Sequence, residues 1–167
     1  KAATLALADH NGPVYLRFGR PKVPVFTDPS QKFEIGKGIK LIDGSDVTIV
    51  ATGHLVWESI EAAKALKESG ISAEVININT IKPLDKKIIL ESAAKTKCIV
   101  SAEEHNFLGG LGESISRVLS KNLPLPQEFV ATKDTFGESG TPAQLMEKYG
   151  LNAASIVEKV KKVISRK

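Results

Sequence analysis

Short apolar runs rich in β-branched residues alternate with helical periodicity along most of this chain, and this alternation limits the fold more than any other feature. Strands are predicted at residues 38–42, 46–52, 73–78, 97–102 and 128–132, and helices are predicted to follow Gly53, Asp85, Gly110, Thr141 and Asn152. Each crossover between parallel strands returns a helix over the sheet, so this order covers both faces with helices. We therefore predict an α/β fold of three layers, with a mostly parallel sheet in the middle.

The first 35 residues follow another pattern. Residues 1–20 predict a weakly apolar helix that ends at Asn11-Gly12, followed by an alternating strand over 13–18. One helix and one strand cannot enclose a core of their own. Three prolines within residues 21–35 indicate a linker that crosses a surface. We therefore expect residues 1–20 to be the tail of another domain, 21–35 a linker, and 36–167 a complete domain.

Composition indicates which classes of partner are excluded and in which compartment the protein is located. No apolar run approaches the ~20 residues of a membrane span, so we expect no membrane partner. The net charge of +4 is spread along the chain and interleaved with acids, which argues against a nucleic-acid partner. The one basic cluster, within residues 159–167, lies where cations complement a helix dipole and solvate an outer face. A single cysteine, Cys98, inside an apolar strand is typical of a reducing compartment, and we expect a cytoplasmic location.

Residues 100–114 bring together more chemically reactive groups than any other stretch. After the predicted strand come Glu103, Glu104, His105, Gly109, Gly110 and Gly112. Carboxylates beside a histidine suit acid–base chemistry, and a polar network, an interface or a regulatory contact at the strand end is the alternative. The glycines lack the third glycine of a dinucleotide fingerprint, so a tight turn is favoured over a nucleotide site. The other two histidines lack metal-ligand spacing, and no metal site is predicted.

Two further segments carry weaker signals. Arg17 and Arg20 flank Gly19 near a predicted strand end, where a guanidinium group suits an anion, and a solvated arginine pair is the alternative. Residues 134–142 are typical either of a binding loop or of a turn that caps the following helix through Ser139 or Thr141.

Several segments, taken in order, resemble transketolase. They are residues 12–21, 46–53, 79–85, 103–112, 136–142 and 148–151. The chain resembles the C-terminal part of that enzyme, with the end of the pyrimidine-binding domain followed by the C-terminal domain. Deoxyxylulose-phosphate synthases and the beta subunits of 2-oxoacid dehydrogenases share this domain and are the close alternatives. A non-catalytic domain that stabilises a dimer or regulates an enzyme is a further one.

The resemblance implies an enzyme of the pentose phosphate pathway that moves a two-carbon ketol unit between sugar phosphates. It implies thiamine diphosphate and a divalent cation, Mg or Ca, in the complete enzyme. The family's Gly-Asp-Gly metal-diphosphate motif does not occur within these residues, so we expect no catalytic, cofactor-binding or metal-binding residue here and no activity of the chain alone. The implied partners are the remaining transketolase domains or an N-terminal subunit, in a homodimer or heterotetramer. Arg20 matches the family's substrate-phosphate arginine, whereas His105 matches a motif position without a chemical role.

Overall fold

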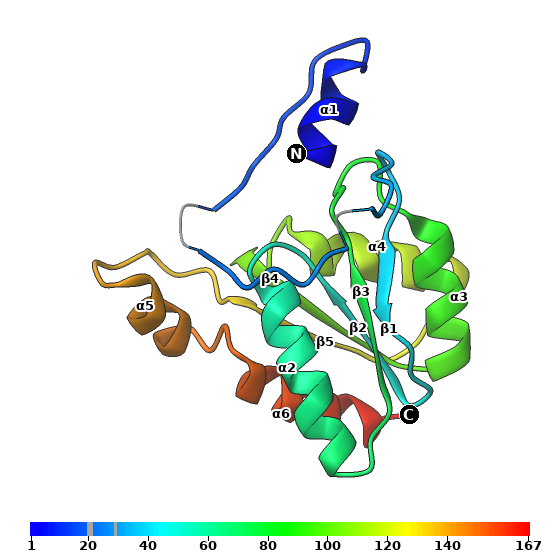
Figure 1. Ribbon diagram of the computed structural model, residues 1–167. Coiled ribbons are helices and arrows are strands. Elements are labelled where there is room, and N and C mark those ends of the chain that lie inside the picture. The colour runs from blue at the N-terminus through cyan, green and yellow to red at the C-terminus, as the bar shows by residue number, and fades with distance from the viewer. Residues whose placement is uncertain (20–21, 29) are drawn as a thin grey trace.

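The computed structural model describes residues 1–19, 22–28 and 30–167 (Figure 1). Its helices and strands are, in chain order, α1 (Ala2–Ala8), β1 (Ile39–Ile42), β2 (Val47–Ala51), α2 (Leu55–Glu68), β3 (Ala73–Asn77), α3 (Lys86–Thr96), β4 (Ile99–Asn106), α4 (Leu111–Asn122), β5 (Gln127–Thr132), α5 (Pro142–Lys148) and α6 (Ala153–Ile164).

The strands form one sheet in the order β1-β3-β2-β4-β5. Strands β3, β2, β4 and β5 run parallel to one another, and β1 joins the edge antiparallel to β3, with Ile39 opposite Asn77. The prediction of a mostly parallel sheet is confirmed. The antiparallel edge strand allows the chain to enter the sheet from the edge at which the parallel strands end.

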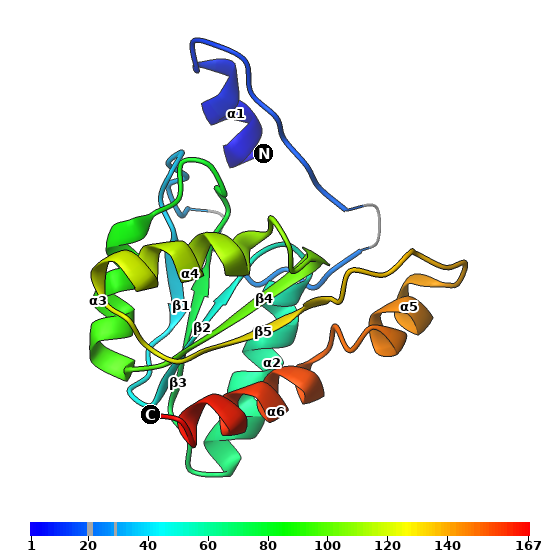
Figure 2. The ribbon, with the colours of Figure 1, turned by 180° about the vertical axis from the view of Figure 1, so that it is seen from behind.

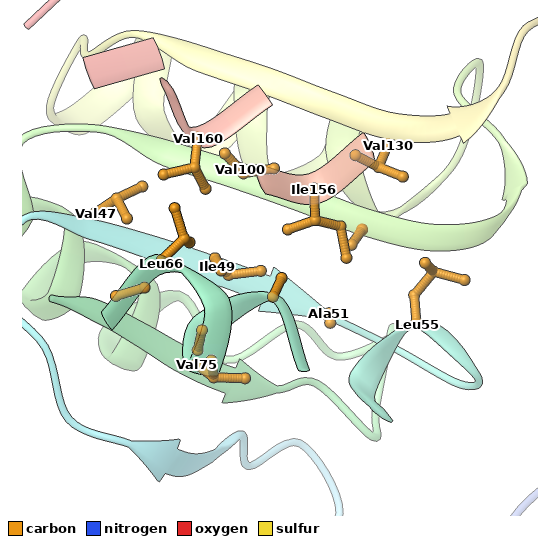
Figure 3. Close-up of a cluster of buried hydrophobic side chains, with 14 of the residues drawn as sticks. Val47, Ile49, Ala51, Leu55, Leu66, Val75, Val100, Val130, Ile156 and Val160 are labelled. Atoms are coloured by element: carbon orange, nitrogen blue, oxygen red, sulfur yellow. The ribbon is translucent and has the colours of Figure 1, made fainter. Parts of the chain in front are cut away.

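Helices cover both faces of the sheet, as the sequence predicts (Figures 1 and 2). Helices α2 and α6 pack on one face, and α3 and α4 pack on the other. Strand β2 alternates between them, because Val47, Ile49 and Ala51 belong to the first cluster and Val50 belongs to the second. Figure 3 shows the first cluster, in which side chains of α2 and α6 meet those of the strands. Burying each large aliphatic side chain contributes roughly 1.5–3 kcal/mol to stability.

Three helix starts have the side-chain caps that the sequence predicts. Asp85 Oδ1 accepts the backbone N–H of Ile88 at 3.2 Å. Asn152 Oδ1 accepts the N–H of Ser155 at 2.9 Å. Thr141 forms a complete capping box with Gln144, followed by a proline at the first helical position. Local capping therefore fixes where α3, α5 and α6 begin.

Two buried carboxylates hold outer elements to the sheet. Glu74 in β3 is fully buried and binds Lys40 of β1 at 2.9 Å and Lys95 of α3. Glu128 in β5 binds Arg166 at 2.6 Å and Lys162 at 3.1 Å. Lys159 lies 3.9 Å from the same carboxylate, so three members of the basic cluster at the end of α6 pair with Glu128 and the cluster does not simply solvate an outer face.

The N-terminal segment differs from its prediction. Helix α1 forms but buries no residue, and both views show it standing away from the sheet (Figures 1 and 2). The strand predicted over 13–18 is wrong for this structure, because these residues have no strand pairing within the described chain and Tyr15 and Phe18 are 87% and 82% exposed. A strand needs a partner for its backbone hydrogen bonds, and alternation alone does not supply one.

The segment 22–28 contacts the domain near the start of α2. The ring of Phe26 lies 6.2 Å from the ring of Trp57, and Phe26 packs against the cluster that α2 and α6 share. This contact anchors the segment to the outer side of α2.

Candidate functional site

The parallel strands end at a common edge of the sheet, which we call the carboxyl edge. After β2 the chain passes to β3 on one side, whereas after β4 it passes to β5 on the other, so the strand order reverses between β2 and β4. Open α/β sheets bind ligands at this reversal point. The loops at 52–54 and 106–110 border it.

The N-terminal segment reaches this same edge. Gly19 lies against the imidazole of His54, at the start of α2, so closely that a Cβ on Gly19 would stand 3.1 Å from His54 Cδ2 and still nearer to Nε2. The predicted substrate residue Arg20 lies outside the described residues. Its neighbour Gly19 nevertheless brings the chain beside the end of β2.

Strand β4 is longer than predicted and continues through Glu103, Glu104 and His105 to Asn106. Glu103 is 3% exposed. Its Oε2 accepts the backbone N–H of Leu111 at 2.7 Å, and its Oε1 accepts the N–H of Gly112 at 2.8 Å. A single carboxylate therefore caps α4 from the neighbouring strand, where the helix dipole favours negative charge.

The Glu103 cap distinguishes between the two interpretations of the glycine turn, a nucleotide site and a tight turn. The N–H groups that a nucleotide phosphate would take are already bound by Glu103. A Cβ on Gly112 would lie 2.6 Å from Ser101 Oγ, so the glycine allows α4 to approach β4 closely. The tight-turn interpretation of the glycine cluster is therefore the one that the structure supports.

Glu104 and His105 do not converge with Glu103. Both are exposed, and His105 Nδ1 lies 3.0 Å from the backbone oxygen of its neighbour Asn106. The structure therefore does not bring the two carboxylates and the histidine together as an acid–base group. A role for Glu104 and His105 at an interface or in regulation stays a prediction.

Asn106 is a residue of this edge that sequence reasoning missed. Its Nδ2 donates to Asp134 Oδ1 at 2.9 Å, and its Oδ1 accepts the N–H of Leu108 at 2.9 Å. Asp134 has a φ of 48°, in the left-handed region. The one signal in the sequence is a polar amide between the charged run and the glycines, at a place where a turn must form.

Exposed apolar side chains gather on the loops of the carboxyl edge. Leu108 is 51% exposed and Phe136 is 96% exposed, and the Asn106–Asp134 hydrogen bond ties their loops together. The loop at 134–142 caps α5 through Thr141, as one of its two interpretations predicts. Large exposed apolar groups on neighbouring loops are typical of an interaction or ligand-binding surface.

Other reactive groups do not assemble around this edge. Among the described residues, no group of three or more His, Cys, Asp or Glu side chains is arranged to hold a metal ion. Cys98 is buried in the sheet, and this burial raises the pKa of its thiol. Within the same residues, we find no helix with the length and apolarity that a membrane crossing requires.

Comparison with known proteins places the chain in a family. Residues 36–156 match the family model for the transketolase C-terminal domain. The chain belongs to this transketolase family. Over its full length of 167 residues it is 41% identical to the 6-deoxy-6-sulfo-D-fructose transketolase subunit of Clostridium sp. (strain MSTE9), and it covers 52% of that protein. The family assignment thus agrees with the resemblance seen in the sequence.

A solved structure and a second class of relative support the same family. The structure of a split gene transketolase, described as an inactive beta4 tetramer, superposes with a TM-score of 0.93 at 45% identity, over 98% of this chain and 55% of that one. A 1-deoxy-D-xylulose-5-phosphate synthase of Geobacter sulfurreducens is 37% identical over 88% of this chain, which covers 24% of it. The transketolase C-terminal fold is confirmed, and the chain spans about half the length of its transketolase relatives.

Proposed function

We propose that this chain is the C-terminal part of a thiamine-diphosphate transketolase that transfers a two-carbon ketol unit between sugar phosphates. The observation that carries the proposal is the 41% identity, over the whole chain, to a transketolase subunit about twice as long. We assign the complete enzyme to the cytoplasm and to sugar-phosphate metabolism of the pentose phosphate type.

The surface of the N-terminal segment supports a partner for this chain. Its exposed large apolar side chains are Leu5, Val14, Tyr15, Leu16, Phe18, Val23 and Val25. Water-exposed apolar groups at this density are stable once another surface buries them. In our proposal residues 1–20 complete the pyrimidine-binding domain. The remaining transketolase domains, or an N-terminal subunit, provide that partner.

The residues of this chain do not fit the cofactor's diphosphate. The helix start that most resembles a phosphate site, at Gly110 to Gly112, is filled by the Glu103 carboxylate. A phosphate placed there would meet that carboxylate, and two like charges in one buried site repel. In our proposal the partner binds thiamine diphosphate and the divalent cation. This chain contributes Arg20 for the substrate phosphate.

The alternatives to a transketolase differ from it in the reaction that they support. A deoxyxylulose-phosphate synthase is favoured by the 37% identity to one such enzyme. Such an enzyme, like a 2-oxoacid dehydrogenase, takes a 2-oxo acid as donor and releases carbon dioxide, whereas ketol transfer from a sugar phosphate releases none. A non-catalytic domain would support neither reaction.

The test uses the assembled enzyme, recovered from its own cells through an affinity tag on this chain. We expect ketol transfer from a ketose phosphate donor to an aldose phosphate acceptor, without release of carbon dioxide. Decarboxylation of pyruvate instead would support a synthase or dehydrogenase. Absence of both reactions in an assembly that contains the partner would support the non-catalytic alternative.

A second measurement concerns the chain alone. Titration calorimetry of the 167-residue chain with thiamine diphosphate and magnesium should show no binding in the micromolar range. Micromolar binding would contradict our assignment of the cofactor to the partner.

A further inference from the structure

A hollow between the start of α3 and the end of α4 gathers cationic side chains. It measures about 170 Å³ and is lined by Lys86, Arg117, Val118, Lys121 and Asn122. Arg117 and Lys121 lie one turn apart on α4, and Lys86 is the first residue of α3. Figure 2 shows α4 crossing the face of the sheet with its end directed toward α3. Three positive charges from two helices therefore border one small concave surface.

These three charges have no carboxylate partner in residues 1–19, 22–28 and 30–167. The carboxylates nearest to them in sequence are engaged elsewhere. Asp85 caps α3, Glu91 lies 3.8 Å from Lys87, and Glu113 accepts the backbone N–H of Gly109. Lys86, Arg117 and Lys121 are therefore left without an ion pair among the residues that the structure describes.

The two other cationic clusters of the domain are built differently. Lys40 and Lys95 surround the buried Glu74, and the lysines of α6 surround Glu128. Lys86 lies at the positive end of the α3 dipole, which the Asp85 side chain already caps, and the first turn of α3 adds no acidic residue of its own. An anion from solution would offset the mutual repulsion of Lys86, Arg117 and Lys121.

We propose that this hollow binds the phosphate group of a small phosphorylated molecule. The guanidinium of Arg117 can hold two phosphate oxygens in a fork, while Lys86 and Lys121 supply point charges on either side. Val118 is 5% exposed and forms the apolar floor between these cations. A volume of about 170 Å³ admits a phosphate group but not a helix or strand of another protein.

A neighbouring hollow indicates the rest of the ligand. It measures about 490 Å³, shares Arg117, and is otherwise lined by Gly109, Glu113, Ser114, Ser116 and Ser120. Serine hydroxyls donate and accept hydrogen bonds, so they suit hydroxyl groups attached to the phosphate. The ligand class is therefore a phosphorylated polyol or sugar, bound on the outer face of α4.

The test is a titration of the ¹⁵N-labelled 167-residue chain with glycerol 3-phosphate at constant ionic strength, followed by NMR. We expect saturable shifts of the backbone amides at residues 86–88 and 117–122, and none with glycerol alone. Inorganic phosphate should shift the amides of Arg117, Val118, Lys121 and Asn122 but leave the amides of Ser114 and Ser120 unchanged. Absence of saturable shifts in both hollows would overturn the proposal.

Matched charge variants show whether the hollow itself binds. Replacing both cations of α4, Arg117→Gln with Lys121→Gln, should weaken binding of glycerol 3-phosphate by about tenfold or more. Lys161→Gln removes an exposed cation from α6 and should leave the affinity unchanged. All three residues are exposed, so the variants are expected to fold, and the unchanged dispersion of their spectra checks this. Equal weakening by Lys161→Gln would mean that net charge, rather than this hollow, attracts the anion, and would refute the proposal.

Discussion

The carboxylate of Glu103 accepts the backbone N–H of Gly112 at 2.8 Å, so one buried side chain joins the end of β4 to the first turn of α4. Its second oxygen binds the N–H of Leu111. Glu103→Gln removes the negative charge and leaves only one oxygen for two donors, so we expect a loss of roughly 1–3 kcal/mol in the free energy of unfolding. Urea denaturation measures this loss. Glu104→Gln, on the exposed neighbour, should stay within about 0.5 kcal/mol of the original protein, and equal losses in the two variants would contradict the capping role.

A methyl group at Gly112 should disturb the same junction. Its Cβ would lie 2.6 Å from Ser101 Oγ and 2.5 Å from the ring of Phe129, both within the sheet. We expect Gly112→Ala to lower the free energy of unfolding by roughly 1–3 kcal/mol, because α4 must move away from β4. Gly137→Ala is the matched control, since no atom lies within 4 Å of its Cβ position. A Gly112→Ala protein as stable as the control would show that α4 has room to shift.

The surface carboxyl of Asp43 should titrate well below its ordinary pKa. Hydrogen bonds from Lys95, and then those with Glu74 and Lys40, lower the pKa of Asp43 from 3.8 to about 2. A lowered pKa in the folded state adds stability above pH 3.8, and this contribution is lost as the pH falls toward 2. The carboxyl ¹³C shift of Asp43 should therefore have its midpoint near pH 2. Lys95→Gln removes the largest cause and should move the midpoint upward, and a midpoint near 3.8 in the original protein would contradict the network.

Hydrogen exchange should separate the first 35 residues from the sheet. Helix α1 buries no residue, and the described residues of 13–18 are exposed, whereas β2 is buried at every position. We expect the amides of α1 to exchange through local opening at a much lower free energy than those of β2. Comparable protection of α1 and β2 in the 167-residue chain would mean that α1 is stable without a partner.

Arg20 gives a prediction for the complete enzyme, and it depends on the family resemblance because Arg20 lies outside the described residues. A charge-assisted bidentate contact contributes roughly 1.5–3 kcal/mol, so Arg20→Ala should lower kcat/KM for phosphorylated donors by about 10- to 150-fold. Hydroxypyruvate has no phosphate, and its kinetics should change little. Arg17→Ala tests the other arginine of the pair. Equal losses for phosphorylated and unphosphorylated donors would assign Arg20 a structural role.

Much of the domain could be predicted because its signals are local. The apolar run at 47–50 gives β2, and Asp85, Thr141 and Asn152 mark helix starts through hydrogen bonds that span only three residues. The direction of β1 depends instead on its pairing with β3, more than 30 residues later in the chain. The strand at 13–18 fails for the same reason, since periodicity reports which side chains suit a strand and not whether a partner strand is present.

The candidate site was harder to predict because its residues contact partners that are far away in the sequence. The sequence drew attention to Glu103, Glu104 and His105 as one group, suited either to acid–base chemistry or to a polar, interface or regulatory contact, whereas the structure buries the first and exposes the other two. A usable signal was present. Side chains alternate along a strand, so Glu103 lies on the same side of β4 as the buried Ser101, against which Gly112 packs. The hydrogen bond to an amide nine positions later could not be inferred from local spacing.

The antiparallel edge strand β1 also determines how this domain can be joined to other molecules. Because Ile39 lies opposite Asn77, the chain arrives at the carboxyl edge, whereas Lys167 donates to the backbone oxygen of Asp46 just before β2, at the opposite edge. Figures 1 and 2 show the N and C ends on opposite sides of the sheet. A linker attached at Lys167 would therefore immobilise the protein on a sensor surface with the carboxyl edge facing outward. A fusion at Lys1 would instead place its cargo on the side of the exposed N-terminal segment.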